Sequence, residues 1–144
     1  MNRPHAAQAP ILIVEDNPMD LDLTLRAFSR ASLSNPIQVA RDGQEALDHL
    51  AQWEQGAPLP VVILLDLKLP KVDGLEVLRQ IKTHPHFSMI PVIVLTTSAG
   101  EADIFSAYGA GANSYILKPV DFDRFLDMAA QIQRYWIVLN QQAG

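Results

Sequence analysis

The sequence predicts one α/β domain, a doubly wound fold in which helices cover both faces of a five-stranded parallel sheet. Three observations lead to this fold class. Five short apolar runs alternate along the 144 residues with longer segments that have apolar residues at helical spacing. Polar or turn-forming residues follow each run. The run at 61–65, VVILL, is apolar at every position, which is typical of a parallel strand buried on both faces.

Two strand–helix units occupy the first part of the chain. The run ILIV at 11–14 predicts the first strand, and Pro18 suits the first turn of the following helix, where a backbone N–H is not needed. The run IQVA at 37–40 predicts the second strand, and Asp42 with Gly43 opens the second helix. Helical spacing assigns one face of each helix to the core: Leu21, Leu25 and Phe28 in the first, and Ala46, Leu47, Leu50 and Trp53 in the second.

Two more units follow. The run VVILL at 61–65 predicts the third strand, and the third helix opens at Asp73 and Gly74. The run VIVL at 92–95 predicts the fourth strand, and the fourth helix lies within 101–111, where glycines end it. The apolar residues of the third helix are Leu75, Leu78 and Ile81.

The fifth strand at 114–117, SYIL, is followed by Pro119 and by a long final helix at 122–140. Core packing explains one face of this helix: Phe122, Phe125, Leu126, Ala129, Ile132, Trp136 and Leu139. A second apolar set lies off that face: Met128, Tyr135, Ile137 and Val138. A helix that is apolar on more than one side usually buries the second side as well, so this set predicts a homodimer through the final helix and the adjacent side of the fifth strand. The alternative is that these are isolated apolar residues on the surface.

Composition excludes several classes of function. The formal net charge is −5 and Lys and Arg form no run, which argues against a nucleic-acid partner. The chain has no cysteine, so disulfides, thiol catalysis and cysteine zinc sites are excluded. This absence is compatible with the cytoplasmic location that we expect. No apolar stretch approaches the length of a membrane span. Residues 1–9 lack the apolar segment of a signal peptide and are expected to be a flexible leader.

Charged and hydroxyl residues follow four of the predicted strands. Glu15 and Asp16 come after the first strand and Asp66 after the third. Thr96 comes after the fourth and Lys118 after the fifth. Because the carboxyl ends of parallel strands meet at one edge, where ligands bind in such folds, these side chains are expected to lie together. The three carboxylates carry a formal charge of about −3, which Mg2+ and the lysine would neutralise.

These residue types fit phosphoryl transfer, which depends mainly on positioning and on stabilisation of charge. An aspartate can itself be the nucleophile and form an aspartyl phosphate. The hydroxyl of Thr96 and the ammonium of Lys118 would then bind phosphoryl oxygens. Taken alone, Asp66 is explained equally well as a capping or loop aspartate. Its occurrence together with Asp16 and Lys118 favours the chemical role.

Four segments stand in order after four different strands: ILIVEDN, LLDLKLPKVDG, VIVLTTS and YILKP. Together they closely resemble the receiver domain of two-component response regulators, over roughly residues 10–135. The resemblance implies a flavodoxin-like fold with strand order 2-1-3-4-5 and five helices, and a receiver domain at 10–140. It also implies Mg2+ as the cofactor, with Mn2+ as a substitute.

The resemblance implies a role for each matching residue. Asp66 would be the phosphoacceptor and would share the metal with Asp16, a direct ligand. Glu15 would act through a metal-bound water, and the backbone carbonyl of Lys68 would be a further protein ligand. The switch hydroxyl, the phosphate-binding lysine and the switch aromatic would be Thr96, Lys118 and Tyr115. Thr97 is bulkier than the alanine or glycine that is common at its position, which bears on the rate of phosphotransfer.

A finer resemblance rests on further segments. TTS, GANSYILKP, a final helix with YW near its end, and the long segment LAQWEQGAPLPVVILLD are similar to stand-alone receivers encoded with bacterial and cyanobacterial phytochrome histidine kinases. The implied partner is a sensor histidine kinase of the phytochrome type. Because no output domain is expected after the last helix, the signal would pass by protein contact, by dimerisation or by relay of the phosphate. No membrane or nucleic-acid partner is expected.

Two alternatives differ in their chemistry. A haloacid-dehalogenase-type phosphatase also uses a strand-end aspartate and Mg2+, but it needs a second aspartate two residues later, where this chain has Lys68. A degenerate receiver would be a constitutive interaction module that is never phosphorylated, and the intact set of Asp16, Asp66, Thr96 and Lys118 argues against it. The main interpretation is not an enzyme, because the chain would catalyse only its own phosphorylation and dephosphorylation.

Overall fold

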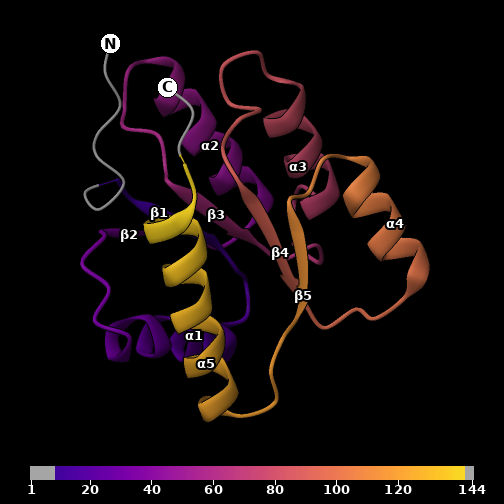
Figure 1. The fold of residues 1–144 in the computed structure, drawn as a ribbon. Coiled ribbons are helices and arrows are strands. Elements are labelled where there is room, and N and C mark those ends of the chain that lie inside the picture. The colour runs from indigo at the N-terminus through magenta and orange to yellow at the C-terminus, as the bar shows by residue number, and fades with distance from the viewer. Residues whose placement is uncertain (1–8, 142–144) are drawn as a thin grey trace.

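Five parallel strands form the centre of the computed structural model, which describes residues 9–141 (Figure 1). The strands are β1 (Ile11–Val14), β2 (Ile37–Ala40), β3 (Val62–Leu65), β4 (Val92–Thr96) and β5 (Ser114–Leu117). They lie in the order β2-β1-β3-β4-β5, which confirms the predicted fold class and strand order. The central strand β3 therefore ends between the ends of β1 and β4.

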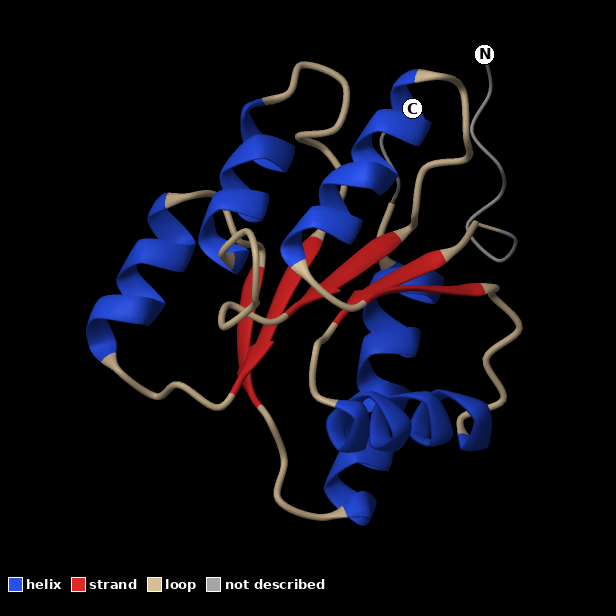
Figure 2. Cartoon of the chain, turned by 180° about the vertical axis from the view of Figure 1, so that it is seen from behind, coloured by secondary structure: helices blue, strands red, loops and turns tan. Residues whose placement is uncertain are grey.

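Helices cover both faces of the sheet (Figure 2). They are α1 (Pro18–Arg30), α2 (Gly43–Glu54), α3 (Gly74–Thr83), α4 (Glu101–Gly109) and α5 (Phe122–Ile132), and α5 continues as the π-helical segment η1 (Gln133–Leu139). Helix α1 packs against α5 on one face, while α2, α3 and α4 lie side by side on the other. Among the residues that the structure describes, no helix is both long enough and apolar enough to cross a membrane.

Successive residues of each strand point to opposite faces of the sheet, which explains why β1 and β3, covered on both faces, are apolar at every residue. In β1, Ile11 and Ile13 pack with α1 and α5, whereas Leu12 and Val14 pack with the helices of the other face. Strands β3 and β4 follow the same alternation and are buried at every residue. Only the strand ends are therefore free to carry polar function.

Helix α3 begins directly against the backbone that follows β3. The N–H of Gly74 donates to the carbonyl of Leu67 at 3.0 Å. A Cβ atom at Gly74 would lie 2.2 Å from the carbonyl oxygen of Asp66, so only glycine fits there. Gly43, at the start of α2, approaches the same loop, where a Cβ would lie 1.8 Å from the carbonyl oxygen of Val72. The two glycines allow both helices to brace the loop that carries Asp66.

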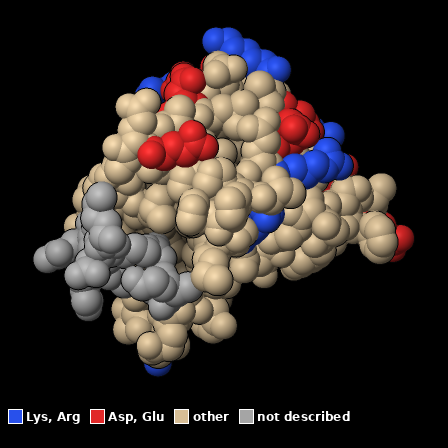
Figure 3. Space-filling model, turned by 90° about the horizontal axis from the view of Figure 1, so that it is seen from above, with Lys and Arg blue, Asp and Glu red and all other residues tan. Residues whose placement is uncertain are grey.

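Lys82 connects the elements at the opposite end of the sheet. Its Nζ donates to the carbonyl oxygens of Ser88 and Ile90 at 3.0 and 2.7 Å, and to Oδ1 of Asn113 at 2.9 Å. The last turn of α3 is thereby tied to the segments that lead into β4 and β5. Figure 3 looks onto this end of the molecule, where the visible Lys and Arg residues lie among Asp and Glu and form no broad basic surface.

Two strands and the leader differ from their predicted bounds. Strand β4 extends one residue further than predicted, to Thr96. Strand β3 begins at Val62, because Val61 lies just outside the ladder, where its N–H donates to the carbonyl of Pro10. Ala9, which the sequence places in the flexible leader, is buried, and its carbonyl accepts a hydrogen bond from Nδ2 of Asn35 at 2.8 Å. The rest of the predicted leader, 1–8, lies outside the described residues.

The final helix changes its hydrogen-bonding pattern after Ile132. The following turns are π-helical, and the N–H of Asn140 donates to the carbonyl of Tyr135 at 2.7 Å, a bond from residue i+5 to residue i. A π turn contains more residues than an α turn, so the side that faces the core shifts along the sequence. Ile137, five residues after Ile132, is therefore buried, whereas Trp136 is only half-buried.

This shift corrects the predicted second apolar face. Met128 and Ile137 are only 7% and 8% exposed and belong to the core between the sheet, α1 and α5, so the prediction that they lie on an uncovered side is wrong. Tyr135 and Val138 are 54% and 68% exposed, as that prediction requires. Leu139, expected in the core, is 56% exposed beside them. The uncovered apolar residues of the final helix are therefore Tyr135, Val138 and Leu139.

Candidate functional site

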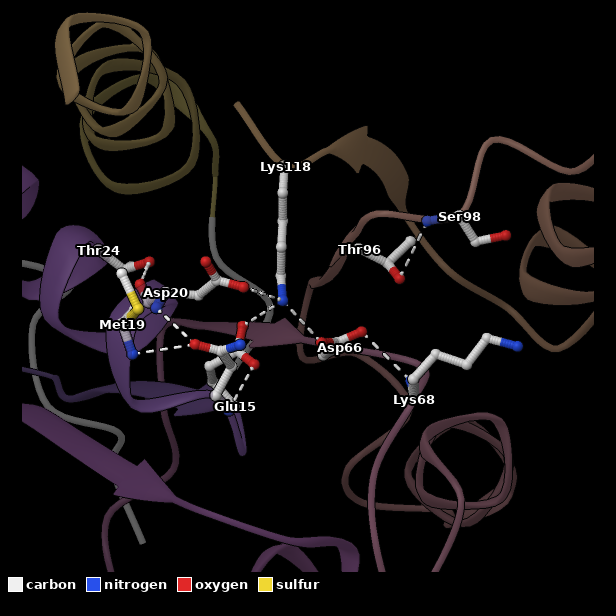
Figure 4. A network of polar contacts seen from close by, with 10 residues as sticks. Glu15, Met19, Asp20, Thr24, Asp66, Lys68, Thr96, Ser98 and Lys118 are labelled. Carbon is white, nitrogen blue, oxygen red and sulfur yellow. Dashed lines mark hydrogen bonds and ion pairs between the residues drawn. The ribbon is translucent and has the colours of Figure 1, made fainter. Parts of the chain in front are cut away.

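The carboxyl ends of the strands bring the predicted charged residues to one place (Figure 4). Glu15 directly follows β1, and Asp66 directly follows the neighbouring central strand β3. Lys118 follows β5, which lies two strands away from β3, and its extended side chain reaches back to both carboxylates. Thr96 is the last residue of β4, between these two strand ends.

The ammonium group of Lys118 contacts three carboxylates. Its Nζ lies 2.7 Å from Oε1 of Glu15, 2.8 Å from Oδ2 of Asp66 and 2.9 Å from Oδ2 of Asp20. An ammonium has three N–H donors, so each has an acceptor. The side chains of Lys118, Glu15 and Asp66 are 6%, 5% and 7% exposed. Burial disfavours the charged lysine, but the hydrogen bonds to Asp66, Glu15 and Asp20 outweigh it and raise the pKa of Lys118 above its ordinary value.

Backbone N–H groups hold the second oxygen of each buried carboxylate. Oε2 of Glu15 accepts from the N–H of Asn17 at 3.1 Å, and Oδ1 of Asp66 accepts from the N–H of Lys68 at 3.2 Å. Asn17 is also the N-cap of α1, so the start of that helix is bonded to Glu15. These bonds fix the orientation of two carboxylates that the fold has already placed side by side.

Glu15, Asp16 and Asp66 form a group that fits a divalent cation. Each offers one carboxylate oxygen, and these oxygens lie within 4.8 Å of one another. Glu15 and Asp66 are buried, while Asp16 is exposed and completes the group from the solvent side. Mg2+ prefers such oxygen ligands and keeps several waters. When bound, Mg2+ supplies positive charge both to the carboxylates and to the oxygens of a phosphoryl group.

Burial makes Glu15 a weaker acid than usual. Removal from water raises the pKa of Glu15 to about 7, and the hydrogen bonds from Lys118 and Asn17 offset only part of this effect. The nearby charge of Asp66 adds to the rise. Near neutral pH Glu15 is therefore only partly ionised in the absence of metal, and a second cation beside it would favour its charged form.

The loop after β4 links the site to Tyr115. Thr96 is fully buried, and its Oγ1 accepts a long hydrogen bond of 3.5 Å from the N–H of Ser98. The hydroxyl of Tyr115 donates to the carbonyl oxygen of Ser98 at 2.8 Å, and burial raises the pKa of Tyr115. The half-buried Tyr115 therefore already contacts the loop that carries Thr96. Thr97, which lies between Thr96 and Ser98 in this loop, is exposed.

A polar chain leads from the same loop to α4. The hydroxyl of Ser98 donates to Oδ2 of Asp103 in the first turn of α4. Nζ of Lys68 lies 3.9 Å from the same oxygen of Asp103. The Lys68 side chain is 69% exposed and points away from Asp66 (Figure 4). Position 68 therefore provides no carboxylic acid beside Asp66, which the phosphatase alternative would require.

Sequence reasoning missed Asp20 and Asp103. Asp20 stands four residues after Asp16, in the first turn of α1, and so returns to the edge of the sheet that Asp16 occupies. An acidic residue one helical turn after a strand-end carboxylate is the signal that could have predicted it. The position of Asp103 depends on the path of the loop after β4, which no spacing in the sequence indicates.

Known proteins share both the sequence and the fold of this chain. A family model described as "Response regulator receiver domain" matches residues 11–130. The chain is 45% identical over 135 residues to "Probable methanogenesis regulatory protein FilR2" of Methanothrix harundinacea (strain 6Ac), covering 93% of this chain and 87% of that protein.

Two solved structures closely match the fold. The crystal structure of the phosphorylated cyanobacterial phytochrome response regulator RcpA superposes with a TM-score of 0.88 at 37% identity, covering 95% of this chain and 99% of that one. The Mn2+-bound form of response regulator Rcp1 superposes with a TM-score of 0.85 at 35% identity, covering 94% and 99%.

Glu15 should make the stability of the metal-free protein depend on pH. Its pKa rises from 4.5 to about 7 on folding, so between these values the folded state binds more protons than the unfolded state. The free energy of unfolding should therefore fall as the pH rises through this window, by about 3 kcal/mol at most. Urea unfolding at a series of pH values, with a chelator present, would measure how steeply the free energy of unfolding falls with pH. The Glu15→Gln variant should lose most of this pH dependence, and an unchanged slope in that variant would contradict the assignment.

Proposed function

This chain belongs to the response regulator receiver family, and we propose that Asp66 is the residue on which it accepts a phosphoryl group. Its function is that of a phosphorylation-dependent response regulator. The observation that carries the proposal is the place of Asp66 at the end of the central strand. Lys118 lies on one side of its carboxylate at 2.8 Å, and Thr96 and Lys68 lie on the other (Figure 4).

The transfer would run in line from a phosphohistidine of a sensor kinase to Asp66. An oxygen of Asp66 attacks the phosphorus while the phosphorus–nitrogen bond breaks. The electron pair of that bond returns to the imidazole, which takes up a proton. Lys118 then binds a phosphoryl oxygen in place of Oδ2 of Asp66, and the hydroxyl of Thr96 donates to another. These fixed donors stabilise the charge that moves onto the phosphoryl oxygens.

Receiver domains bind Mg2+, and the relative Rcp1 has been solved with Mn2+. In this chain the ligands would be Asp16 and Asp66, with Glu15 acting through a metal-bound water. The grouping of their oxygens within 4.8 Å supports this set. The backbone carbonyl of Lys68 would be the remaining protein ligand, because the loop that contains it directly follows Asp66.

Phosphorylation would switch the face formed by α4, β5 and α5. The new phosphoryl group draws Thr96 toward Asp66 and takes over the contact of Lys118, and the loop after β4 moves with Thr96. Tyr115 is bonded to Ser98 of that loop at 2.8 Å, so motion of the loop shifts this bond as well. Ser98 also donates to Asp103, which carries the change to α4.

The kinase partner would be a phytochrome-type sensor histidine kinase. The likeness to RcpA, described as a phytochrome response regulator, supports this partner. FilR2, the relative that is 45% identical, is described instead as a probable methanogenesis regulatory protein. Because such kinases take phosphate from ATP, the chain would work in the cytoplasm. A downstream protein or phosphotransfer partner would read the switched face.

The chain would catalyse only its own phosphorylation and dephosphorylation, and would act on no separate substrate. A haloacid-dehalogenase-type phosphatase remains the enzymatic alternative, and the outward-pointing Lys68 disfavours it because no acid stands there. A degenerate receiver remains the non-catalytic alternative. The packing of Lys118 against Asp66 and Glu15 disfavours it, since a module that is never phosphorylated needs no such buried charges.

A homodimer through the final helix would bury its exposed apolar residues, Tyr135, Val138 and Leu139. A groove of about 670 Å3 runs along α5 and η1 beside β5, and Ile116, Tyr135, Trp136 and Leu139 contribute its apolar lining. Arg124, Asp127 and Arg134 line the same groove. Residues of both charge signs on one surface can pair across a twofold axis, so a second copy of this chain suits the groove.

Phosphorylation at Asp66 has a direct mass-spectrometric test. Incubation with Mg2+ and a small phosphodonor should add one base-labile phosphoryl group to the protein. The Asp66→Asn variant should gain none, and Lys118→Met should react about tenfold more slowly or worse, because a donor to the phosphoryl oxygens is lost. A phytochrome-type kinase should label the same residue.

Asp73→Asn is the matched control for this test. Asp73 is an exposed aspartate in the loop after Asp66, and its side chain makes no capping hydrogen bond. This variant should be labelled like the unchanged protein. Equal labelling of Asp66→Asn, or turnover of phosphate esters by the unchanged protein, would overturn the proposal.

The dimer is tested by sedimentation at tens of micromolar protein. The unchanged chain should sediment as a dimer, and Val138→Glu should shift it to monomer because it places a charge in the apolar contact. Tyr135→Ala should weaken the dimer to a smaller extent. Met89→Glu, at an exposed apolar residue in the loop before β4, serves as the control and should leave the dimer intact. A monomeric unchanged chain would contradict the proposal.

A further inference from the structure

Asp20 is the third carboxylate on Lys118, and it differs from the other two. Glu15 and Asp66 belong to the group whose oxygens fit a metal ion, and Asp20 does not. Its Oδ2 lies 2.9 Å from Nζ of Lys118, and its side chain is 26% exposed. Figure 4 shows it on the α1 side of the ammonium, away from Thr96.

Helix α1 holds Asp20 at this place. The backbone N–H of Asp20 donates to Oδ1 of the N-cap residue Asn17 at 3.0 Å. Its carbonyl oxygen accepts from the hydroxyl of the buried Thr24 at 2.8 Å. Asp20 also stands in the first turn of the helix, where the backbone dipoles favour a negative charge. The carboxylate is therefore presented by a rigid element.

A bound metal ion and Lys118 would compete for the same two carboxylates. The ammonium occupies Oε1 of Glu15 and Oδ2 of Asp66, which are also the carboxylates of the metal group. Two cations that share ligands in a buried site repel each other strongly, because the dielectric there is lower than in water. Lys118 is 6% exposed, so water offers it little compensation when those ligands are shared. It therefore needs a partner that the metal does not use.

We propose that Asp20 is a positioning residue that anchors the ammonium of Lys118 on the α1 side of the site, so that a metal ion and Lys118 occupy the site together. The inference rests on the proposed roles of Asp16 and Asp66. In the phosphorylated state Asp20 keeps its contact with Lys118, while the contact with Asp66 passes to a phosphoryl oxygen. Asp20 thereby sets both the metal affinity of the site and the position of its lysine.

Binding of Mn2+ alone tests the inference without any kinase or phosphodonor. Free Mn2+ is counted by electron paramagnetic resonance during a titration, with thermal melting in chelator to show that each variant is folded. Asp20→Asn should weaken Mn2+ binding about fivefold or more. Asp20→Glu, which restores a carboxylate, should recover most of the affinity.

Asp22→Asn is the matched control. Asp22 lies on the same helix but pairs with Arg26 at 3.0 Å, where both side chains are more than half exposed. This variant removes the same charge without touching Lys118 and should change Mn2+ affinity less than about twofold. An effect as large as that of Asp20→Asn would show a general loss of negative charge and overturn the inference.

A double-mutant cycle separates positioning from simple attraction. Asp20→Asn removes one negative charge in every background, but it can act through the ammonium only where Lys118 is present. The loss of Mn2+ affinity should therefore be several-fold larger in the unchanged protein than in Lys118→Met. Equal losses in the two backgrounds would overturn the inference.

Asp16→Asn shows which proposal has failed if a result is negative. Loss of Mn2+ binding in Asp16→Asn together with normal binding in Asp20→Asn would reject the role of Asp20 and leave the proposed metal site standing. Normal Mn2+ binding in Asp16→Asn would reject the metal site itself, and the role of Asp20 with it.

Discussion

The buried ammonium group of Lys118 is the interaction on which the candidate site depends. Glu15 and Asp66 lie side by side with almost no access to water, and two such carboxylates cannot both remain charged without a cation between them. Lys118 supplies that cation from β5 at the edge of the sheet, and its three N–H groups donate to Glu15, Asp66 and Asp20. Removing one partner of a buried ion pair typically costs about 3–5 kcal/mol, so the group holds together as a unit.

The parallel sheet makes this convergence possible. Strands β1, β3 and β4 are buried at every residue, so polar groups collect at their carboxyl ends. Gly74 lets α3 start against the carbonyl of Asp66, and Asn17 joins the start of α1 to Glu15. The hydrogen bonds of Ser98 to Tyr115 and Asp103 then connect the site to β5 and α4. A local change of charge at Asp66 therefore has a contiguous route to an outer face of the molecule.

The sequence predicted the strands, the helix starts and the strand-end residues well, because each rests on local chemistry. Apolar runs define the strands, and Asp42 and Pro18 stand where helices begin. The final helix was harder, because counting residues at α-helical spacing cannot foresee a π turn, which buried Ile137 and exposed Leu139. Asp20 was missed because its partner Lys118 is 98 residues away in sequence, and only the folded sheet brings the two together.

A crystal structure with Mg2+ and beryllofluoride, a mimic of the phosphoryl group, tests the central claim most directly. The account predicts the beryllium bonded to a carboxylate oxygen of Asp66, with the metal ion on Asp16 and Asp66. Nζ of Lys118 should contact a fluorine atom of the adduct while it keeps its bond to Asp20. An adduct on another residue, or a Lys118 side chain turned out to solvent, would contradict the account.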